Sequence, residues 1–528
     1  MNIIPTGRRA RFGGVAIAFS CVLIAVVILI NALFSMLAKK YLWYTDLTSD
    51  EIYTLSDAAV EAIKDIDKDV DIIFCDDPDN IMEEYYQRLI YETALELEKA
   101  NSYVHVRNIN IWRNPTAVDK YKADSKSSIY STSVIIASGS EFRVYTVKAM
   151  YTFNDADSAT PWAYSGEKKM CAGILSVTQA EQPICCFTYN HGEPFVTETD
   201  MNANGEILAL LQDAGYKLQA IDLTQEEIPA DCRLLFIYDP QDDFLAAEPG
   251  ISDISEIKKI DKFLDGTNAM MVFIDPATRK LPVFEEYLEE WGIKFDRYED
   301  DFGTLFSATV KDNAHSISQD GFSLVGAYAS SEHLGASLHK DLRTTYPPKV
   351  IFKNAMGISY SYPDTHYQNE EDSSIEYWYG YYYSNGVSRS IYDVFNAYPT
   401  SVEMANGKEI PRKDTLSDIH LMTVTSETHS DGKNTDYSYV LACGSTDFLS
   451  KPLLQSNTYG NSDVMLYALR AMGKETVPVG LTLKPFSSTT IENITKSEQE
   501  QYTAVLIITP AVVTFGLGLF FLVRRKYL

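Results

Sequence analysis

Two long runs of apolar residues stand near the two ends of the chain. Residues 12–37 and 503–523 contain no charged side chain, and each is long enough for a helix that crosses a hydrocarbon layer of about 30 Å. The first run exceeds the apolar region of about 7–15 residues that a cleaved signal peptide has. The pattern therefore predicts two membrane-spanning helices that flank one large ectodomain.

In residues 45–150, short β-branched runs alternate with helical stretches. The order is strand, helix, strand, helix, strand, strand, which is the order of a thioredoxin core. The elements are expected at 70–75, 81–100, 104–110, 115–121, 133–137 and 142–147. Cys75 is followed by two aspartates and has no second cysteine nearby, so we expect a thioredoxin-like α/β domain without redox chemistry.

Residues 168–300 alternate more regularly and predict a doubly wound parallel sheet, because near-continuous apolar strands are buried between helices on both faces. Strands are expected at 184–189, 217–223, 234–238 and 270–274, and helices at 169–179, 205–214, 254–264 and 283–291. A late strand at 439–444 and a helix at 463–472 read as part of the same domain, which would then comprise 168–300 and 436–475. Residues 301–435 would form an insertion.

That insertion is rich in tyrosine, with ten between Tyr360 and Tyr398. The densest cluster is Tyr377, Trp378, Tyr379 and Tyr381. Exposed, it would suit a sugar, peptide or protein partner, because Tyr buries a large area at small entropic cost. The interpretation that we favour is a β-rich subdomain held by cross-strand aromatic pairs, since Asn385-Gly386 is typical of a hairpin turn.

The charge distribution orients the chain and excludes one class of partner. A net charge of −28 is unsuited to binding nucleic acid, whose phosphates must be neutralised. Basic residues flank the spans unevenly: six lie at the termini and two follow the first span. They are Arg8, Arg9, Arg11, Arg524, Arg525 and Lys526 against Lys39 and Lys40. The positive-inside rule then places 1–11 and 524–528 in the cytoplasm and the ectodomain outside the cell (plasma) membrane.

Candidate chemistry lies where the strands of the doubly wound sheet end, since ligands bind there in such folds. The ligand-binding candidates are His191, Glu193, Asp239, Asp275 and Asp447. A His with carboxylates could bind a metal or act as acid and base, but for each residue we favour the plainer explanation of capping, turn formation or a backbone hydrogen bond. The sequence has no nucleophile elbow and no phosphate-binding loop of the G-x-x-x-x-G-K-[ST] type. We therefore expect neither an ATPase nor any bound cofactor or metal.

Several short segments are similar, in the same order along the chain, to motifs of one family. They are Asp46-Leu47-Thr48 with Tyr53-Thr54-Leu55-Ser56, then Asn190-His191-Gly192-Glu193, Tyr238-Asp239-Pro240, Gly444-Ser445-Thr446-Asp447-Phe448-Leu449-Ser450, Asn461-Ser462-Asp463, and the closing span with its Arg524-Arg525. Together they resemble the GldG-like proteins, the auxiliary extracytoplasmic components of gliding-motility-type ABC transport systems. Asn190, Asp239 and Ser445 depart from the family pattern, which has Gly, Gly and Asp there.

The resemblance implies a non-catalytic, membrane-anchored accessory subunit that works with a permease and a separate ATPase subunit. Its ectodomain would bind a ligand or contact the permease. Two alternatives stay open from the residues alone. One is an extracytoplasmic hydrolase that uses His191 and Glu193, and the other is a structural or adhesion ectodomain that displays the tyrosine-rich surface.

Overall fold

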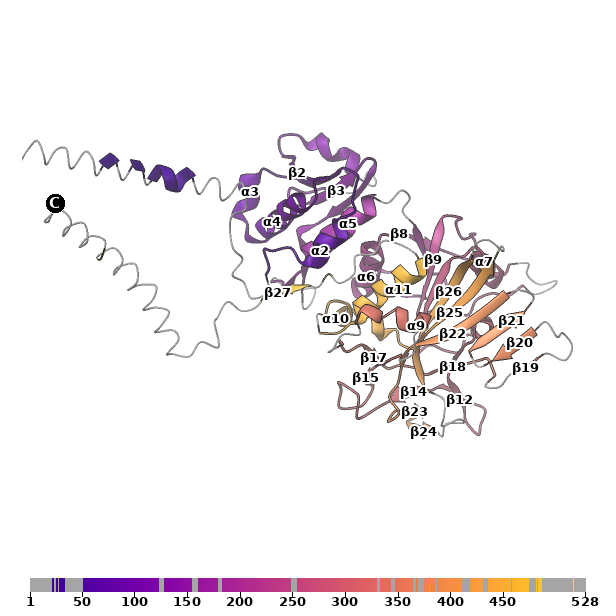
Figure 1. The fold of residues 1–528 in the computed structure, drawn as a ribbon. Helices are drawn as coiled ribbons and strands as arrows, with labels where there is room; N and C mark the ends of the chain where they lie inside the picture. The colour runs from indigo at the N-terminus through magenta and orange to yellow at the C-terminus, as the bar shows by residue number, and fades with distance from the viewer. Residues whose placement is uncertain are drawn as a thin grey trace, which may run out of the picture. The chain divides into compact units, whose positions relative to one another are not determined.

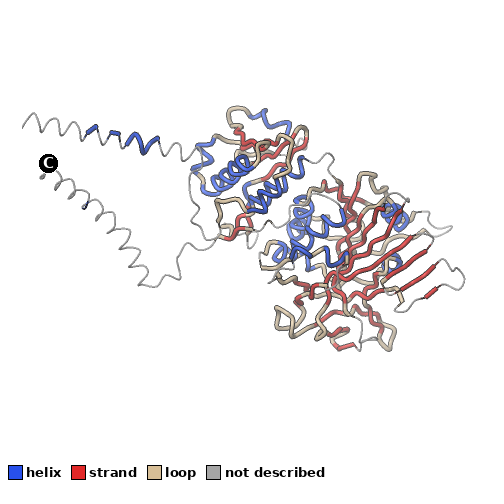
Figure 2. Tube along the Cα trace, viewed as in Figure 1, coloured by secondary structure: helices blue, strands red, loops and turns tan. Residues whose placement is uncertain are grey.

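The structure is a computed structural model of the 528-residue chain. It describes residues 51–122, 128–153, 160–178, 183–247, 254–329, 333–342, 347–363, 367–368, 375–378, 380–384, 387–410, 418–430, 435–456, 458–473, 481 and 483–486, together with 21–22, 25–26, 28–33 and 516. Its contacts divide the chain into two units, Met1–Lys484 and Pro485–Leu528. The first unit has the mixed α/β architecture expected from the sequence (Figures 1 and 2).

The first part of this unit contains a four-stranded sheet in the order β2-β1-β3-β4. Strand β1 runs parallel to β2 and antiparallel to β3, and β3 is antiparallel to β4. The elements are β1 (Val70–Phe74), β2 (Val104–Asn108), β3 (Val134–Ser138), β4 (Glu141–Tyr145), α2 (Asp57–Ile63), α3 (Pro78–Glu83), α4 (Tyr85–Ala100), α5 (Gly166–Thr178), and the 3-10 helices Pro115–Tyr121 and Val147–Met150.

Helix α4 forms because its apolar side chains recur on one face. Leu89, Ile90, Ala94 and Leu97 are buried, which is the spacing of an amphipathic helix. The single helix expected at 81–100 is in fact two, because Glu84 takes an extended conformation between α3 and α4 (φ −92°, ψ 120°).

A thirteen-stranded sheet forms the centre of the second part, and its parallel section runs β8-β7-β9-β10-β26. The strands are β7 (Ile184–Thr188), β8 (Lys217–Ile221), β9 (Cys232–Tyr238), β10 (Ala269–Phe273) and β26 (Thr435–Cys443). The prediction that a strand near 439–444 returns to this sheet is confirmed, since β26 pairs in parallel with β10.

Helices cover both faces of the parallel section, so alternate residues of each strand enter two different cores. In β9, Leu234 and Phe236 face one core and Leu235 and Ile237 face the other. The first core contains residues of α6 (Glu198–Asp213) and α11 (Asn461–Gly473). The second contains residues of α7 (Glu256–Asp265) and α8 (Pro282–Glu290). Burial on both faces explains the near-continuous apolar strands of the sequence.

Beyond β26 the same sheet continues in antiparallel fashion, which the sequence patterns did not predict. The order is β26-β25-β22-β21-β20-β19 (Figure 1), so strands of the 301–435 stretch lengthen the central sheet. Strands β21 and β22 pair on either side of Asn385-Gly386, with Ser384 opposite Val387. This pairing confirms the predicted hairpin; the two turn residues themselves lie outside the described residues. The strands are β19 (Tyr367–Gln368), β20 (Ile375–Trp378), β21 (Tyr381–Ser384), β22 (Val387–Asn396) and β25 (His420–Ser430).

Shorter elements complete the described part. The strands are β5 (Tyr151–Thr152), β6 (Ala163–Tyr164), β11 (Ile293–Phe295), β12 (Arg297–Glu299), β13 (Leu305–Ser307), β14 (Thr309–Lys311), β15 (Ser323–Val325), β16 (Ala327–Tyr328), β17 (Ile351–Lys353), β18 (Ile358–Tyr360), β23 (Val402–Ala405), β24 (Lys408–Ile410) and β27 (Lys484–Pro485). The helices are α9 (Leu334–Ser337) and α10 (Lys451–Leu454), with 3-10 turns at Lys340–Leu342 and Asp447–Leu449.

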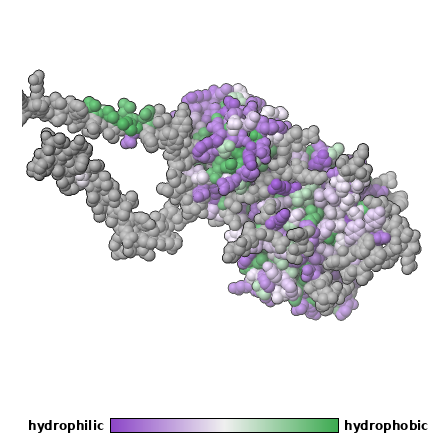
Figure 3. All heavy atoms as spheres, in the orientation of Figure 1, coloured by the Kyte–Doolittle hydropathy of each residue, from purple (hydrophilic) through white to green (hydrophobic). Residues whose placement is uncertain are grey.

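The two expected membrane spans, 12–37 and 503–523, fall largely outside the described residues. Within the described part of the chain, no helix has the length and apolar character needed to cross a membrane. The described residues between 21 and 33 are helical and expose large apolar side chains, Ile28 and Leu29 among them (Figure 3).

The segment before α2 is tied to Lys484, far away in the sequence. The Lys484 ammonium pairs with Glu167 Oε2 at 2.6 Å and donates to the carbonyl oxygens of Glu51, at 3.1 Å, and Thr54. Glu167 in turn accepts hydrogen bonds from the amide and hydroxyl of Ser56, the N-cap of α2. We call Ser56, Glu167 and Lys484 the end clamp, because these residues join the start of the region 51–484 to its end.

Candidate functional site

Four parallel strands of the central sheet end at one edge, and their following loops carry the five predicted ligand-binding candidates. His191 and Glu193 follow β7, Asp239 follows β9, Asp275 follows β10 by two residues, and Asp447 follows β26. The Thr278 hydroxyl donates to Asp239 Oδ1 at 3.0 Å, which links the loops after β9 and β10.

Asp275 lies close enough to Asp239 to affect its pKa. Burial and the charge of Asp275 both raise the pKa of Asp239. The Asp275 carboxylate accepts hydrogen bonds from the Ala277 amide at 2.8 Å and from the Thr446 hydroxyl. Both carboxylates therefore link the loops that follow the parallel strands. Asp447 accepts a hydrogen bond from the Asn354 amide group at 3.1 Å.

Asp239 has an unusual backbone conformation. Its φ of 52° lies in the left-handed region, where glycine is favoured and other residues are strained. This conformation gives a physical reason for the glycine that the GldG-like pattern has at this position.

A second group surrounds His191 and includes a residue that the sequence reasoning missed, Glu256. The His191 Nδ1 atom lies 3.3 Å from Glu193 Oε1, and Nε2 lies 3.1 Å from both carboxylate oxygens of Glu256. The chain turns back at Gly192, whose φ is 84°, and this turn lets Glu193 Oε2 accept from the His191 amide at 2.8 Å. The imidazole also stacks on Phe244, with ring centroids 3.8 Å apart.

This histidine–carboxylate triad of His191, Glu193 and Glu256 is buried and holds the imidazole ring between two carboxylates. The exposed fractions of the three residues are 3%, 2% and 0%. Burial alone would lower the pKa of His191, but the two carboxylates overcome this effect and raise it to about 9. Burial alone would raise the pKa of Glu256, yet hydrogen bonds from His191 and the Leu245 amide lower it. The imidazolium is therefore the stable form near neutral pH.

A general base needs a neutral imidazole with a free nitrogen within reach of a substrate. Here both ring nitrogens face carboxylates, and almost no part of the ring meets solvent. The arrangement favours a structural role, in which a charged network attaches the loop after β7 to the start of α7. Among the described residues, no group of three or more His, Cys, Asp and Glu side chains has the arrangement of a metal site.

The tyrosine-rich cluster lies on the outer strands of the central sheet. Tyr377 and Trp378 belong to β20, where they stand opposite Tyr382 and Tyr381 of β21, and Tyr381 is half-buried. Tyr379 lies outside the described residues. The register is that of cross-strand aromatic neighbours.

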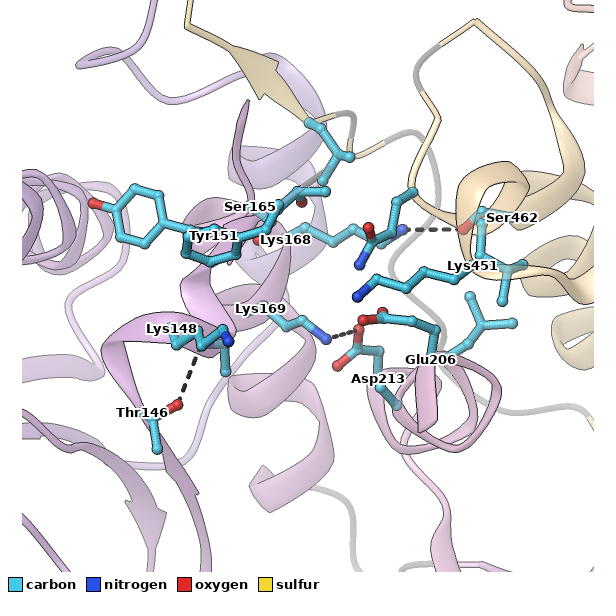
Figure 4. A pocket seen from close by; sticks show the side chains of 18 residues that line it. Thr146, Lys148, Tyr151, Ser165, Lys168, Lys169, Glu206, Asp213, Lys451 and Ser462 are labelled. Carbon is cyan, nitrogen blue, oxygen red and sulfur yellow. Dashed lines mark hydrogen bonds and ion pairs between the residues drawn. The ribbon is translucent and has the colours of Figure 1, made fainter. Parts of the chain in front are cut away.

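A cavity that no sequence pattern indicated lies beside α5 and α6. Its volume is about 400 Å³, and lysines from three elements line it: Lys148, Lys168, Lys169 and Lys451 (Figure 4). The acidic lining residues are Glu206 and Asp213 of α6. Only Lys168 and Lys169 are neighbours in the sequence, so the one local signal was a lysine pair near the start of a helix.

Comparison with known proteins adds no functional assignment. No family model matches the chain, and no curated protein matches it. One solved structure that resembles part of it is the cytoplasmic protein STM3548 from Salmonella typhimurium, at 9% sequence identity. The match covers 54% of this chain and 98% of that one, with a TM-score of 0.25. A similarity this weak gives no information about the function of the present chain.

Proposed function

We propose that this protein is a non-catalytic accessory subunit of an ABC transporter, of the GldG-like kind, anchored in the cell membrane by residues 12–37 and 503–523. Both termini would lie in the cytoplasm, and the described α/β region would lie outside. The partners would be a multi-span permease and a separate ATPase subunit. The ordered family-like segments support this proposal, and Asp239 and Gly192 fit two of the glycine positions by their backbone conformations.

We also propose that the described region contains a thioredoxin-like domain and a doubly wound domain. The sheet order β2-β1-β3-β4, with one parallel and two antiparallel pairings, matches a thioredoxin-like domain. The parallel section β8-β7-β9-β10-β26 with helices on both faces matches a doubly wound domain. Cys75 is buried, and burial raises its pKa to about 11, which is the opposite of what a redox-active thiol needs.

The end clamp is the observation that carries the proposal. A chain with two spans must leave the membrane after residue 37 and return to it before residue 503. The contacts of Lys484 with Glu51, Thr54 and Glu167 bring the opening and closing residues of the ectodomain together. Joined ends suit an ectodomain carried on two neighbouring helices, which could then pack together against one permease.

The environment of His191 bears on the hydrolase alternative. A hydrolytic base would have to release a nitrogen from a carboxylate and reach solvent from a site that is 3% exposed. The hydrolase alternative therefore gains no support from the geometry.

The test is purification of the tagged full-length chain from its native membrane in a mild detergent, with mass spectrometry of the proteins that accompany it. We expect a permease and an ABC ATPase in stoichiometric amounts. A control chain would carry unrelated apolar helices of equal length in place of 12–37 and 503–523. Partners retained by the control would assign the contact to the ectodomain, and partners lost would assign it to the spans. Recovery of the wild-type chain alone, under conditions that keep other membrane complexes intact, would refute the proposal.

A further inference from the structure

The lysine-lined cavity combines side chains from both parts of the ectodomain. Lys168 and Lys169 lie on α5, Lys451 on α10, and Lys148 in the 3-10 turn Val147–Met150. Its volume of about 400 Å³ falls within the range of about 300–1,000 Å³ that small-molecule sites occupy.

Positive charge exceeds negative charge in this cavity, although the chain as a whole carries −28. The lining contains four lysines and two carboxylates, those of Glu206 and Asp213, which gives an excess of two positive charges. Lys169 is paired with Asp213, at 2.6 Å between Nζ and Oδ2. The excess therefore belongs to the remaining lysines.

The ammonium groups of Lys168 and Lys451 can each donate further hydrogen bonds to a ligand. The Lys168 ammonium donates to the Ser462 hydroxyl at 3.3 Å, and burial lowers its pKa although several carboxylates, Asp213 and Asp463 among them, act in the opposite direction. Asp463 does not line the cavity, and burial raises its pKa. The Lys451 ammonium has no hydrogen bond and no ion pair with any residue that the structure describes. Figure 4 shows its ammonium directed into the same space as those of Lys168 and Lys169.

Ser462 adds a further anion-attracting feature. It is the second residue of α11, which begins at Asn461. The positive end of the helix dipole favours anions at this position.

We propose that this cavity binds a phosphate group, held by Lys168, Lys451 and the Ser462 hydroxyl. A phosphate monoester carries about −1.5 to −2 charges near pH 7 and offers three acceptor oxygens. That charge matches the excess in the cavity, and three oxygens suit donors that come from α5, α10 and α11. A planar carboxylate offers one charge and two oxygens. This inference does not rest on the transporter proposal, because it concerns only the described ectodomain.

The test uses the full-length chain in a neutral detergent, with inorganic phosphate and glycerol 3-phosphate as soluble probes. Calorimetric titration at constant ionic strength, with chloride as the balancing anion, separates specific binding from screening. A second arm measures binding to nanodiscs that contain phosphatidic acid, with phosphatidylcholine nanodiscs as reference. Binding of the soluble probes identifies a free phosphorylated compound as the ligand class. Binding of phosphatidic acid alone identifies a lipid headgroup.

Lys168→Gln and Lys451→Gln should each weaken binding about tenfold or more, since each removes a charge-assisted hydrogen bond to the phosphate. Lys451→Gln should leave the unliganded melting temperature unchanged because the Lys451 ammonium has no partner in the described structure, so loss of binding in this variant cannot be ascribed to unfolding. Lys262→Gln is the matched control, with a side chain that is 82% exposed, and should bind as the wild type does. No binding in either arm, or equal binding by wild type and the Lys168→Gln/Lys451→Gln double variant, would overturn the proposal.

Discussion

The buried triad of His191, Glu193 and Glu256 predicts a large and pH-dependent contribution to stability. Replacing His191 with Ala would leave two carboxylates inside the protein without their cation. Removing one partner of a buried ion pair costs about 3–5 kcal/mol. The pKa gives an independent figure: a rise from the ordinary value of 6.5 to about 9 corresponds to about 3 kcal/mol. We therefore expect His191→Ala to lower the free energy of unfolding by about 3 kcal/mol near pH 6.

The sign of the pH dependence follows from the two shifts. The folded-state pKa of His191 is raised, so its stabilising effect is complete below pH 6.5 and is lost as the pH rises through about 9. The folded-state pKa of Glu256 is lowered, so its effect is complete above its ordinary value of 4.5 and is lost as the pH falls further. The contribution of the pair should be greatest between about pH 4.5 and 6.5.

The assay is urea unfolding of the full-length chain in detergent, followed by tryptophan fluorescence at pH 6 and pH 9.5. Hydrogen exchange of the Gln241 and Asp242 amides adds a local readout, because both donate to the carbonyl oxygen of His191 at 2.7 and 2.8 Å. Exchange should be accelerated in the variant at pH 6. The difference between wild type and variant should shrink at pH 9.5.

His105→Ala is the matched control, since this histidine lies 3.4 Å from Asp69 but is 38% exposed. An exposed pair of this kind is expected to contribute less than about 1 kcal/mol. The variant His191→Leu/Glu193→Gln/Glu256→Gln should be more stable than His191→Ala, because it leaves no buried charge uncompensated. A loss below about 1 kcal/mol for His191→Ala, or an equal pH dependence in wild type and variant, would refute the reasoning.

Three further substitution or labelling experiments test separate features. Asp239→Gly should change the free energy of unfolding by less than about 1 kcal/mol, because relief of the strained left-handed backbone offsets the lost side-chain hydrogen bonds. Asp239→Val should lower the free energy of unfolding by about 2 kcal/mol or more. Equal urea midpoints for the two variants would contradict this prediction. Lys484→Met should destabilise the region 51–484 and expose residues 51–56 to protease, whereas Lys484→Met/Glu167→Gln should recover part of the loss since no buried carboxylate stays unpaired. Unchanged cleavage would count against the end clamp. The buried cysteines should resist an aromatic disulfide reagent until urea is added. Burial raises the pKa of most of these thiols and keeps the reagent away from them. Rapid labelling of the folded chain would be evidence against the packing. These cysteines are Cys75, Cys171, Cys185, Cys186, Cys232 and Cys443.

Local patterns predicted the elements of the parallel section closely. Strand β9 was expected at 234–238 and spans Cys232–Tyr238, and β10 was expected at 270–274 and spans Ala269–Phe273. Burial on both faces imposes an apolar run on such strands, so the signal is carried by adjacent residues. Helix α11 was equally visible, because its apolar side chains recur with helical spacing.

Apart from the hairpin at Asn385-Gly386, the antiparallel continuation of the sheet depended on pairing that no local pattern encodes. Strand β22 pairs with β25 across residues far apart in the sequence, such as Ile391 and Thr425. The same applies to the sites. His191 and Glu193 were indicated by their place after a strand, but Glu256 joins them from 65 positions away. Lys451 reaches the cavity of Lys168 only because α10 follows the last parallel strand, and a single lysine at a helix start carries no such information.

The end clamp has one more consequence, for protein engineering. Because Lys484 is hydrogen-bonded to Glu51 and Thr54, the two ends of the region from 51 to 484 lie close together. Domains whose ends lie together can be inserted into a surface loop of another protein, or given new termini elsewhere, without stretching their core. Residues 51–484 could therefore be inserted as one unit into a surface loop of a soluble protein.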